Sequence, residues 1–175
     1  DLAGGAIASE CWDGNFRHGA DVALLRLPSA VPATSYDIVR DLNAGVGDVV
    51  QMAGYGRSGI GTEGDVPIAF GTLRIGNNKY DTRWSATDVT GSPFAFDFDS
   101  GAQAQDTIGN LIGALRDLGT GVSEVMIAPG DSGGPTFLGS LLIGVHSFGA
   151  SFGNPFDLDQ DLNASFGEVG GDVRV

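Results

Sequence analysis

A serine surrounded by glycines is the feature of this chain most suited to covalent chemistry. It lies in the segment GDSGGP at 130–135. Acyl transfer by a serine needs a hydroxyl, a base that takes its proton, and two backbone N–H groups aimed at the oxyanion. Ser132 could supply the hydroxyl, and the N–H groups of Gly130 and Ser132 could converge on one oxygen, since glycine allows the turn this requires. The segment contains no base.

The elements that must position this serine read as short strands. Runs of β-type residues separated by Gly, Pro, Asn and Asp predict an all-β sandwich or barrel. The runs are GAIASECW (5–12), DVALLRL (21–27), DVVQMAGYG (48–56), IAFGTLRIG (68–76), PFAFDFD (93–99), PTFLG (135–139) and SLLIGVHSFG (140–149). One segment, 107–119, has Ile108, Leu111, Ile112 and Leu115 at helical spacing, but interior glycines reduce the expectation to a short helix or an ordered loop.

With these segments in place, the chain resembles the chymotrypsin/trypsin family of serine endopeptidases, of the secreted bacterial type. GDSGGP matches the family's nucleophile motif, DVALLRL at 21–27 its triad-aspartate segment, and GVHSFG at 144–149 the strand along the substrate cleft. VVQMAGYGRSG at 49–59 is similar to the first strand of the second barrel. The motifs follow the family's chain order, and a Gly-Asp-Ser-Gly sequence alone would be equally typical of a surface turn.

The resemblance implies a chymotrypsin-like double β-barrel whose first barrel is incomplete in this chain. Residues 1–28 would be part of the N-terminal barrel, 29–47 the connection between barrels, and 48–175 the C-terminal barrel with the nucleophile and the specificity pocket. Because half a barrel would expose its core, we expect the sequence to be truncated at both ends, without the family's terminal helix.

The resemblance also implies roles for individual residues. Ser132 would be the nucleophile, Gly130 and Ser132 the oxyanion hole, and Asp21 the carboxylate that orients the histidine. Ser147 would donate a hydrogen bond to that carboxylate, and the main chain of Ser147, Phe148 and Gly149 would pair with an extended substrate. In the family, Asp131 binds a newly cut amino terminus, a role that is open here.

The sequence departs from the family pattern at the general base, the histidine that would accept the serine proton. The family's histidine lies some tens of residues before the aspartate, and only 20 residues precede Asp21. His18 reads as a solvated loop residue, and His146 should point away from Ser147 because neighbouring strand residues face opposite sides. We therefore expect a missing N-terminal segment to supply the histidine as a partner of this chain.

The residues expected around the primary specificity pocket leave three preferences open. His146 occupies a position at which relatives with a histidine prefer glutamate before the cleaved bond. Met126 and Ile127, at the expected base of the pocket, favour an apolar side chain. Asp172, near its far wall, would favour a basic one.

An acidic loop at 157–168 partly matches a calcium-binding loop. Asp157, Asp159 and Asp161 have the spacing of its first ligands, but Leu162 stands where the required glycine should be. A solvated loop is the preferred interpretation, with a structural calcium as the weaker alternative. No metal or other cofactor is expected to be required.

Composition limits the partners. The net charge of -13, from 22 acidic and 9 basic residues, makes nucleic acid or an anionic membrane an improbable partner. The single cysteine, Cys11, has no intrachain partner for a disulfide. Together the sequence predicts an extracellular or periplasmic serine endopeptidase acting on peptides or proteins. The alternative is an inactive trypsin-like relative that binds peptides or a protein.

Overall fold

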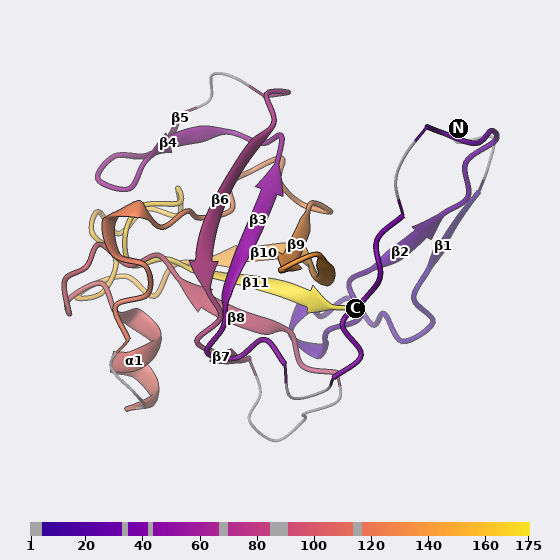
Figure 1. Ribbon diagram of the computed structural model, residues 1–175. Coiled ribbons are helices and arrows are strands. Elements are labelled where there is room, and N and C mark those ends of the chain that lie inside the picture. Colours follow the sequence, from indigo (N-terminus) through magenta and orange to yellow (C-terminus); the bar gives the residue numbers. More distant parts are fainter. Residues whose placement is uncertain (1–4, 33–34, 42–43, 67–69, 85–90, 114–116) are drawn as a thin grey trace.

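The computed structural model describes residues 5–32, 35–41, 44–66, 70–84, 91–113 and 117–175, and these are mostly β-structure (Figure 1). In chain order the elements are β1 (Ala6–Ala8), β2 (Ala23–Leu25), β3 (Val49–Gly54), β4 (Ser58–Ile60), β5 (Gly64–Val66), β6 (Arg74–Lys79), β7 (Thr82–Arg83), β8 (Phe94–Asp97), α1 (Thr107–Ile112), β9 (Pro135–Leu138), β10 (Leu141–Ala150) and β11 (Val169–Arg174). Short 3₁₀ turns lie at Phe16–His18 and Gly121–Ser123. The predicted all-β class is confirmed.

Seven of the strands form one antiparallel sheet in the order β6-β3-β9-β10-β11-β8-β7. Figure 1 shows β3 and β6 crossing the direction of β8, β10 and β11, so the sheet curls on itself like part of a barrel. The long strand β10 lies at its centre, between β9 and β11. The pairing of β10 with β11 shifts register between His146 and Phe148, which leaves Ser147 in a bulge.

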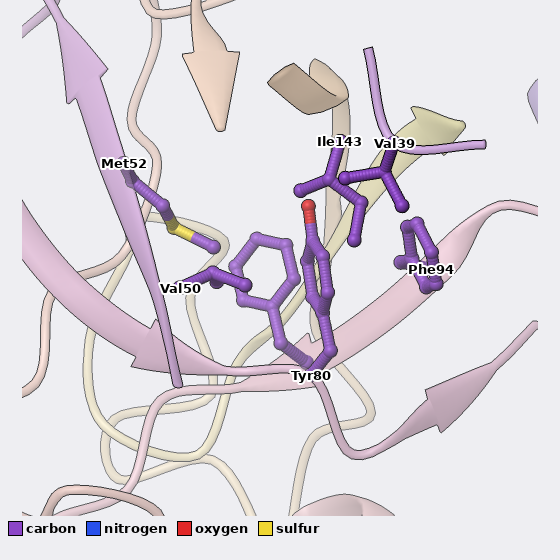
Figure 2. Packing of buried hydrophobic residues seen from close by; sticks show 7 residues of the cluster. Val39, Val50, Met52, Tyr80, Phe94 and Ile143 are labelled. Carbon is purple, nitrogen blue, oxygen red and sulfur yellow. The ribbon is translucent and has the colours of Figure 1, made fainter. Parts of the chain in front are cut away.

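The hydrophobic core fills the concave side of this curled sheet (Figure 2). Along β3, Val50 and Met52 are buried while Val49 and Gln51 are exposed, which is the alternation expected of a strand with one buried face. Tyr80 stacks on Phe94 with ring centroids 4.3 Å apart. The buried cluster comprises Val39, Val50, Met52, Tyr80, Phe94, Phe96 and Ile143.

Strands β1 and β2 pair with each other in a two-stranded antiparallel sheet. Figure 1 shows it projecting from the curled sheet. All six residues of the two strands are exposed, including Ile7 at 68% and Leu24 at 74%. Apolar strand residues with this exposure are unusual in a finished barrel, where one face of each strand is covered.

Specific hydrogen bonds hold the segment before β3 and the ends of α1. Between β2 and β3 the chain forms no strand in its described part, and it attaches to the sheet where the Val39 N–H donates to the Leu142 carbonyl over 2.9 Å. Helix α1 begins after Asp106, whose side chain accepts from the Gly109 N–H, and ends at Gly113 with φ of 60°. Leu115, in the predicted helical pattern, lies outside the described residues.

None of the helices in the described ranges has the length and apolar character needed to span a bilayer.

Candidate active site

The carboxylate of Asp21 lies against the central strand β10. The Ser147 hydroxyl donates to Asp21 Oδ2 over 2.6 Å, across 126 positions of sequence. Ser147 is the bulged residue of β10, so it is released from the regular alternation opposite β11. The bulge directs its hydroxyl to Asp21, while His146 and Phe148 on either side are buried.

Aromatic packing holds the segment that carries Asp21. The 3₁₀ turn at Phe16–His18 is capped by Asn15, whose side chain accepts from the Arg17 N–H. Phe16 packs on Phe148 with ring centroids 4.4 Å apart. Trp84 meets Phe148 edge-on at 5.0 Å. These contacts fix the residues just before Asp21 to the same strand that carries Ser147.

Ser132 lies on an exposed turn between β9 and the preceding loop. The Gly133 N–H donates to the His146 carbonyl and the His146 N–H to the Gly134 carbonyl, each over 2.9 Å, so the turn is tied to β10. Gly130 has φ of 96°, in the region that favours glycine. Within the described ranges, the N–H groups of Gly130 and Ser132 have no protein acceptor, which leaves them available to a bound oxyanion.

The carboxylate of Asp131 accepts two backbone hydrogen bonds that fix the loop containing Ser132. Its Oδ1 accepts from the Gly56 N–H over 2.7 Å, and its Oδ2 accepts from the Ala128 N–H over 2.9 Å. A Cβ at Gly54 would collide with the Asp131 carboxylate, and one at Gly56 would lie 2.7 Å from its Cγ. The glycines of the segment GYG at 54–56 are therefore explained by the close approach of this carboxylate.

Ser132 and Ser147 line one cavity of about 200 Å³. Its wall includes Ile127, Phe148 and Gly149 from the predicted substrate-binding set. The remaining lining residues are Ala128, Pro129, Leu162, Asn163, Ala164 and Glu168. The structure thus brings the predicted nucleophile together with the serine that contacts Asp21, and with most of the residues predicted to bind substrate.

Met126 and His146 line a different cavity. This larger space, about 430 Å³, lies among β3, the β4–β5 hairpin and the segment before Ala128. Asp131 and Ile127 also border it, so the 126–131 segment separates the two cavities. The predicted set around the specificity pocket is therefore divided between two spaces.

His146 belongs to a buried polar network. Its Nδ1 lies 2.9 Å from Asp172 Oδ1, and the hydroxyls of Thr136 and Tyr80 each donate to Asp172 Oδ2 over 2.5 Å. Burial alone lowers the pKa of His146, but the hydrogen bond to Asp172 and its negative charge leave the pKa raised, with smaller contributions from Asp131 and the Ala53 carbonyl. A protonated imidazole paired with Asp172 fits this arrangement.

Both histidines are occupied away from Ser132. The His18 Nδ1 lies 2.7 Å from Asp13 Oδ2 and its Nε2 lies 3.1 Å from the Asn15 amide, on an exposed loop. His146 is bound to Asp172. Neither arrangement makes a base for the Ser132 hydroxyl.

Glu168 is a residue of the Ser132 cavity that the motifs did not indicate. It is buried, its Oε1 accepts from the N–H groups of Asn163 and Ser165 over 2.6 and 3.1 Å, and burial raises its pKa to about 7. The only sequence signal was its place at the end of the acidic loop 157–168, which points to metal binding rather than to a pocket.

In the acidic loop, protein donors occupy the carboxylates of Asp157 and Asp159. The Ser165 hydroxyl donates to Asp157 Oδ1 over 3.1 Å, and the Ser151 hydroxyl donates to Asp157 Oδ2. Asp159 Oδ2 accepts from the Asn163 amide over 2.9 Å. These bonds order the loop internally, next to the cavity wall formed by Leu162 and Ala164.

Comparison with known proteins finds a solved structure with a similar fold. No family model and no curated protein sequence matches the chain. Among solved structures it is similar to neuropsin, a serine protease expressed in the limbic system of mouse brain, with a TM-score of 0.63 and 16% sequence identity. The match covers 98% of this chain and 65% of the neuropsin chain. The chain therefore has a chymotrypsin-like fold resembling that of neuropsin.

Proposed function

We propose that this chain is the catalytic part of a trypsin-like serine endopeptidase that hydrolyses peptide bonds through an acyl-enzyme on Ser132. The observation that carries the proposal is the shared cavity. Ser132 lines it together with Ser147, and Ser147 donates to Asp21. The proposed nucleophile therefore lines a cavity with the serine that binds the proposed orienting carboxylate, and this arrangement supports acyl transfer.

In the proposed reaction, the Ser132 oxygen attacks the peptide carbonyl carbon while an imidazole takes the hydroxyl proton. The N–H groups of Gly130 and Ser132 stabilise the oxyanion. The C–N bond then breaks, and the proton passes from the imidazole to the leaving amine. Water repeats the sequence on the ester and restores the Ser132 hydroxyl. Asp21 orients the imidazole and stabilises its charged form, and no cofactor is needed.

The imidazole is proposed to come from a further N-terminal segment. The exposed apolar residues of β1 and β2 support this, because a segment that completed the first barrel would cover them. In the family, that barrel carries the histidine beside the residue that Asp21 matches. We propose an extracellular or periplasmic location, where such enzymes act on peptides and proteins.

A fluorophosphonate probe, which reacts with activated serines, tests the proposal. The full-length protein should become labelled, and the Ser132→Ala variant should not. The control variant Ser140→Ala should still be labelled. Ser140 lies on the exposed turn between β9 and β10. An unlabelled full-length protein that still binds peptides would instead identify an inactive relative.

The oxyanion hole gives a second prediction, at Gly130. Alanine here would place its Cβ 2.7 Å from Phe70 Cε1 at φ of 96°, so the loop must move and carry its N–H away. We expect kcat to fall by about 10² to 10³, the usual loss for one oxyanion donor.

Gly47→Ala is the matched control for this substitution. Gly47 has φ of 85°, but a Cβ there would meet no atom within 4 Å. It should lower the melting temperature through backbone strain and leave kcat unchanged. A Gly130→Ala enzyme as fast as the Gly47→Ala enzyme would exclude the proposed oxyanion hole.

The lining of the Ser132 cavity supports a preference for apolar side chains before the cleaved bond. Ile127, Phe148 and Leu162 are the largest apolar side chains that line it, and the acidic Glu168 disfavours a glutamate. We expect kcat/KM for a phenylalanine or leucine substrate to exceed that for glutamate by about tenfold or more. An arginine preference that disappears in Glu168→Gln, or a glutamate preference, would contradict this.

A further inference from the structure

Carboxylates gather below the sheet, between the end of β8 and the loops on either side of α1. Asp97 and Asp99 lie at the end of β8, Asp106 caps α1, and Glu124 follows the 3₁₀ turn at Gly121–Ser123. All four are buried, although acidic side chains rarely are without a compensating charge. In the described part of the chain, the one ammonium group near them, Lys79, is paired with Asp117.

Asp99 differs from Asp97 and Glu124 because its carboxylate has no donor among the described residues. Asp97 Oδ2 accepts from the Ile108 N–H over 2.6 Å. Glu124 accepts from the N–H groups of Asp99 and Thr120 over 2.7 and 2.9 Å. Asp99 is 1% exposed, and within the described ranges neither of its carboxylate oxygens has a hydrogen-bond partner. An ionised carboxylate buried without a partner is strongly destabilising, and a bound cation would offset that cost.

The position of Gly119 shows that the carboxylates of Asp99 and Glu124 lie close to each other. A Cβ at Gly119 would collide with Glu124 Oε1 and lie 2.9 Å from Asp99 Oδ2. Both oxygens therefore approach the same point beside a residue that has no side chain. A larger residue at 119 would collide with these carboxylates.

The chemistry at this point favours a cation. Two buried carboxylates whose oxygens lie this close repel each other when both are ionised, and a bound cation would remove that repulsion.

We propose that Asp99 and Glu124 bind a calcium ion, with main-chain carbonyls and water as the remaining ligands. In the described residues, no three His, Cys, Asp or Glu side chains are arranged around a single point, which disfavours zinc. Calcium accepts carbonyl and water oxygens beside one or two carboxylates. The site is separate from the acidic loop at 157–168, where protein donors occupy the carboxylates of Asp157 and Asp159.

A calcium ion here would stabilise the segment that leads to the Ser132 cavity. Glu124 directly precedes Val125, whose N–H donates to the Asn77 carbonyl over 3.0 Å, and Ile127 on the cavity wall follows. The ion would thus connect the β8 end to the substrate wall. It would act on stability and not on the reacting atoms.

Thermal unfolding of the full-length protein tests the site. With calcium at about 100 times its Kd, the melting temperature of the chelator-treated protein should rise by about 5 to 10 °C. Asp99→Asn should remove this rise, and because it relieves repulsion it should raise the melting temperature of the calcium-free protein. Glu124→Gln should also reduce the calcium-dependent rise.

Asp159→Asn is the control, because it removes an acidic side chain from the other candidate loop and should leave the rise intact. Magnesium at the same concentration should have a smaller effect, since it favours a stricter octahedral geometry. The proposal fails if calcium leaves the wild-type melting temperature unchanged. It fails equally if Asp99→Asn retains the full rise. It also fails if magnesium raises the melting temperatures of the wild type and of Asp99→Asn as much as calcium does.

Discussion

Replacing Ser132 by alanine in the full-length protein is expected to lower kcat by about 10⁶, the loss seen when the nucleophile of a serine protease is removed. The proposed pathway requires an ester on this oxygen, and no other hydroxyl takes its place. Ser147 lines the same cavity, but its hydroxyl donates to Asp21 and is not free to attack a substrate. Steady-state hydrolysis of a peptide amide substrate measures the loss.

The stability of the same variant separates chemistry from folding. Ser132 is exposed, so its replacement should leave the melting temperature within about 1 °C of wild type, since surface changes usually cost less than about 0.5 kcal/mol. Ser147→Ala should retain measurable turnover, because it removes only a hydrogen bond to the orienting carboxylate. A Ser132→Ala enzyme that keeps more than about 1% of wild-type kcat would rule out the proposed acyl-enzyme, given the 10⁶ expectation.

Replacing Asp172 by alanine is expected to lower the free energy of unfolding by about 3 to 5 kcal/mol. Asp172 is fully buried and accepts from Thr136, Tyr80 and His146 at once. Its removal leaves an imidazole and two hydroxyls without their acceptor in the core. Urea unfolding followed by tryptophan fluorescence measures the change in the free energy of unfolding.

Two further substitutions serve as comparisons for this measurement. Asp172→Asn keeps an acceptor for the hydroxyls but removes the charge that pairs with His146, so its cost should be smaller than that of alanine. Glu63→Ala removes an exposed acidic side chain and should change stability by less than about 0.5 kcal/mol. If Asp172→Ala costs no more than Glu63→Ala, the network does not stabilise the fold.

The parts of the site that could be predicted from the sequence are those with strong local signals. The glycine-rich turn at Ser132 and the β-type run at 48–56, which contains β3, are examples. The contact of Ser147 with Asp21 was implied by the family resemblance, and the structure has this hydrogen bond. The roles of Ser132, Asp21 and the oxyanion donors remain predictions, as do the domain boundaries at 28 and 47.

Strand β11 shows why other parts could not be predicted. Its sequence, VGGDVR, contains two glycines and an aspartate, residues that are uncommon in strands. The structure explains each one. A Cβ at Gly170 would collide with the Phe96 ring and one at Gly171 with the Phe148 ring, while Asp172 pairs with His146. Such requirements come from residues distant in sequence, so no local pattern indicates them.

The division of the predicted pocket residues has a similar cause. No local sequence pattern at Met126 or His146 indicates which cavity each residue lines. That depends on the path of the 126–131 segment, which passes between the two cavities. The bulge at Ser147 is equally invisible in the sequence, since it depends on the register with β11.

The order of strands in the sheet has a consequence for the folding rate. Strand β8 pairs with β11, and β3 pairs with β9, so partners 72 to 86 positions apart must meet before both pairs are complete. A topology with so high a contact order predicts slow folding, over milliseconds to seconds or longer. Asp172 lies on β11, the last of these strands in chain order, so during synthesis the buried His146 gains its counter-charge only after β11 has been made.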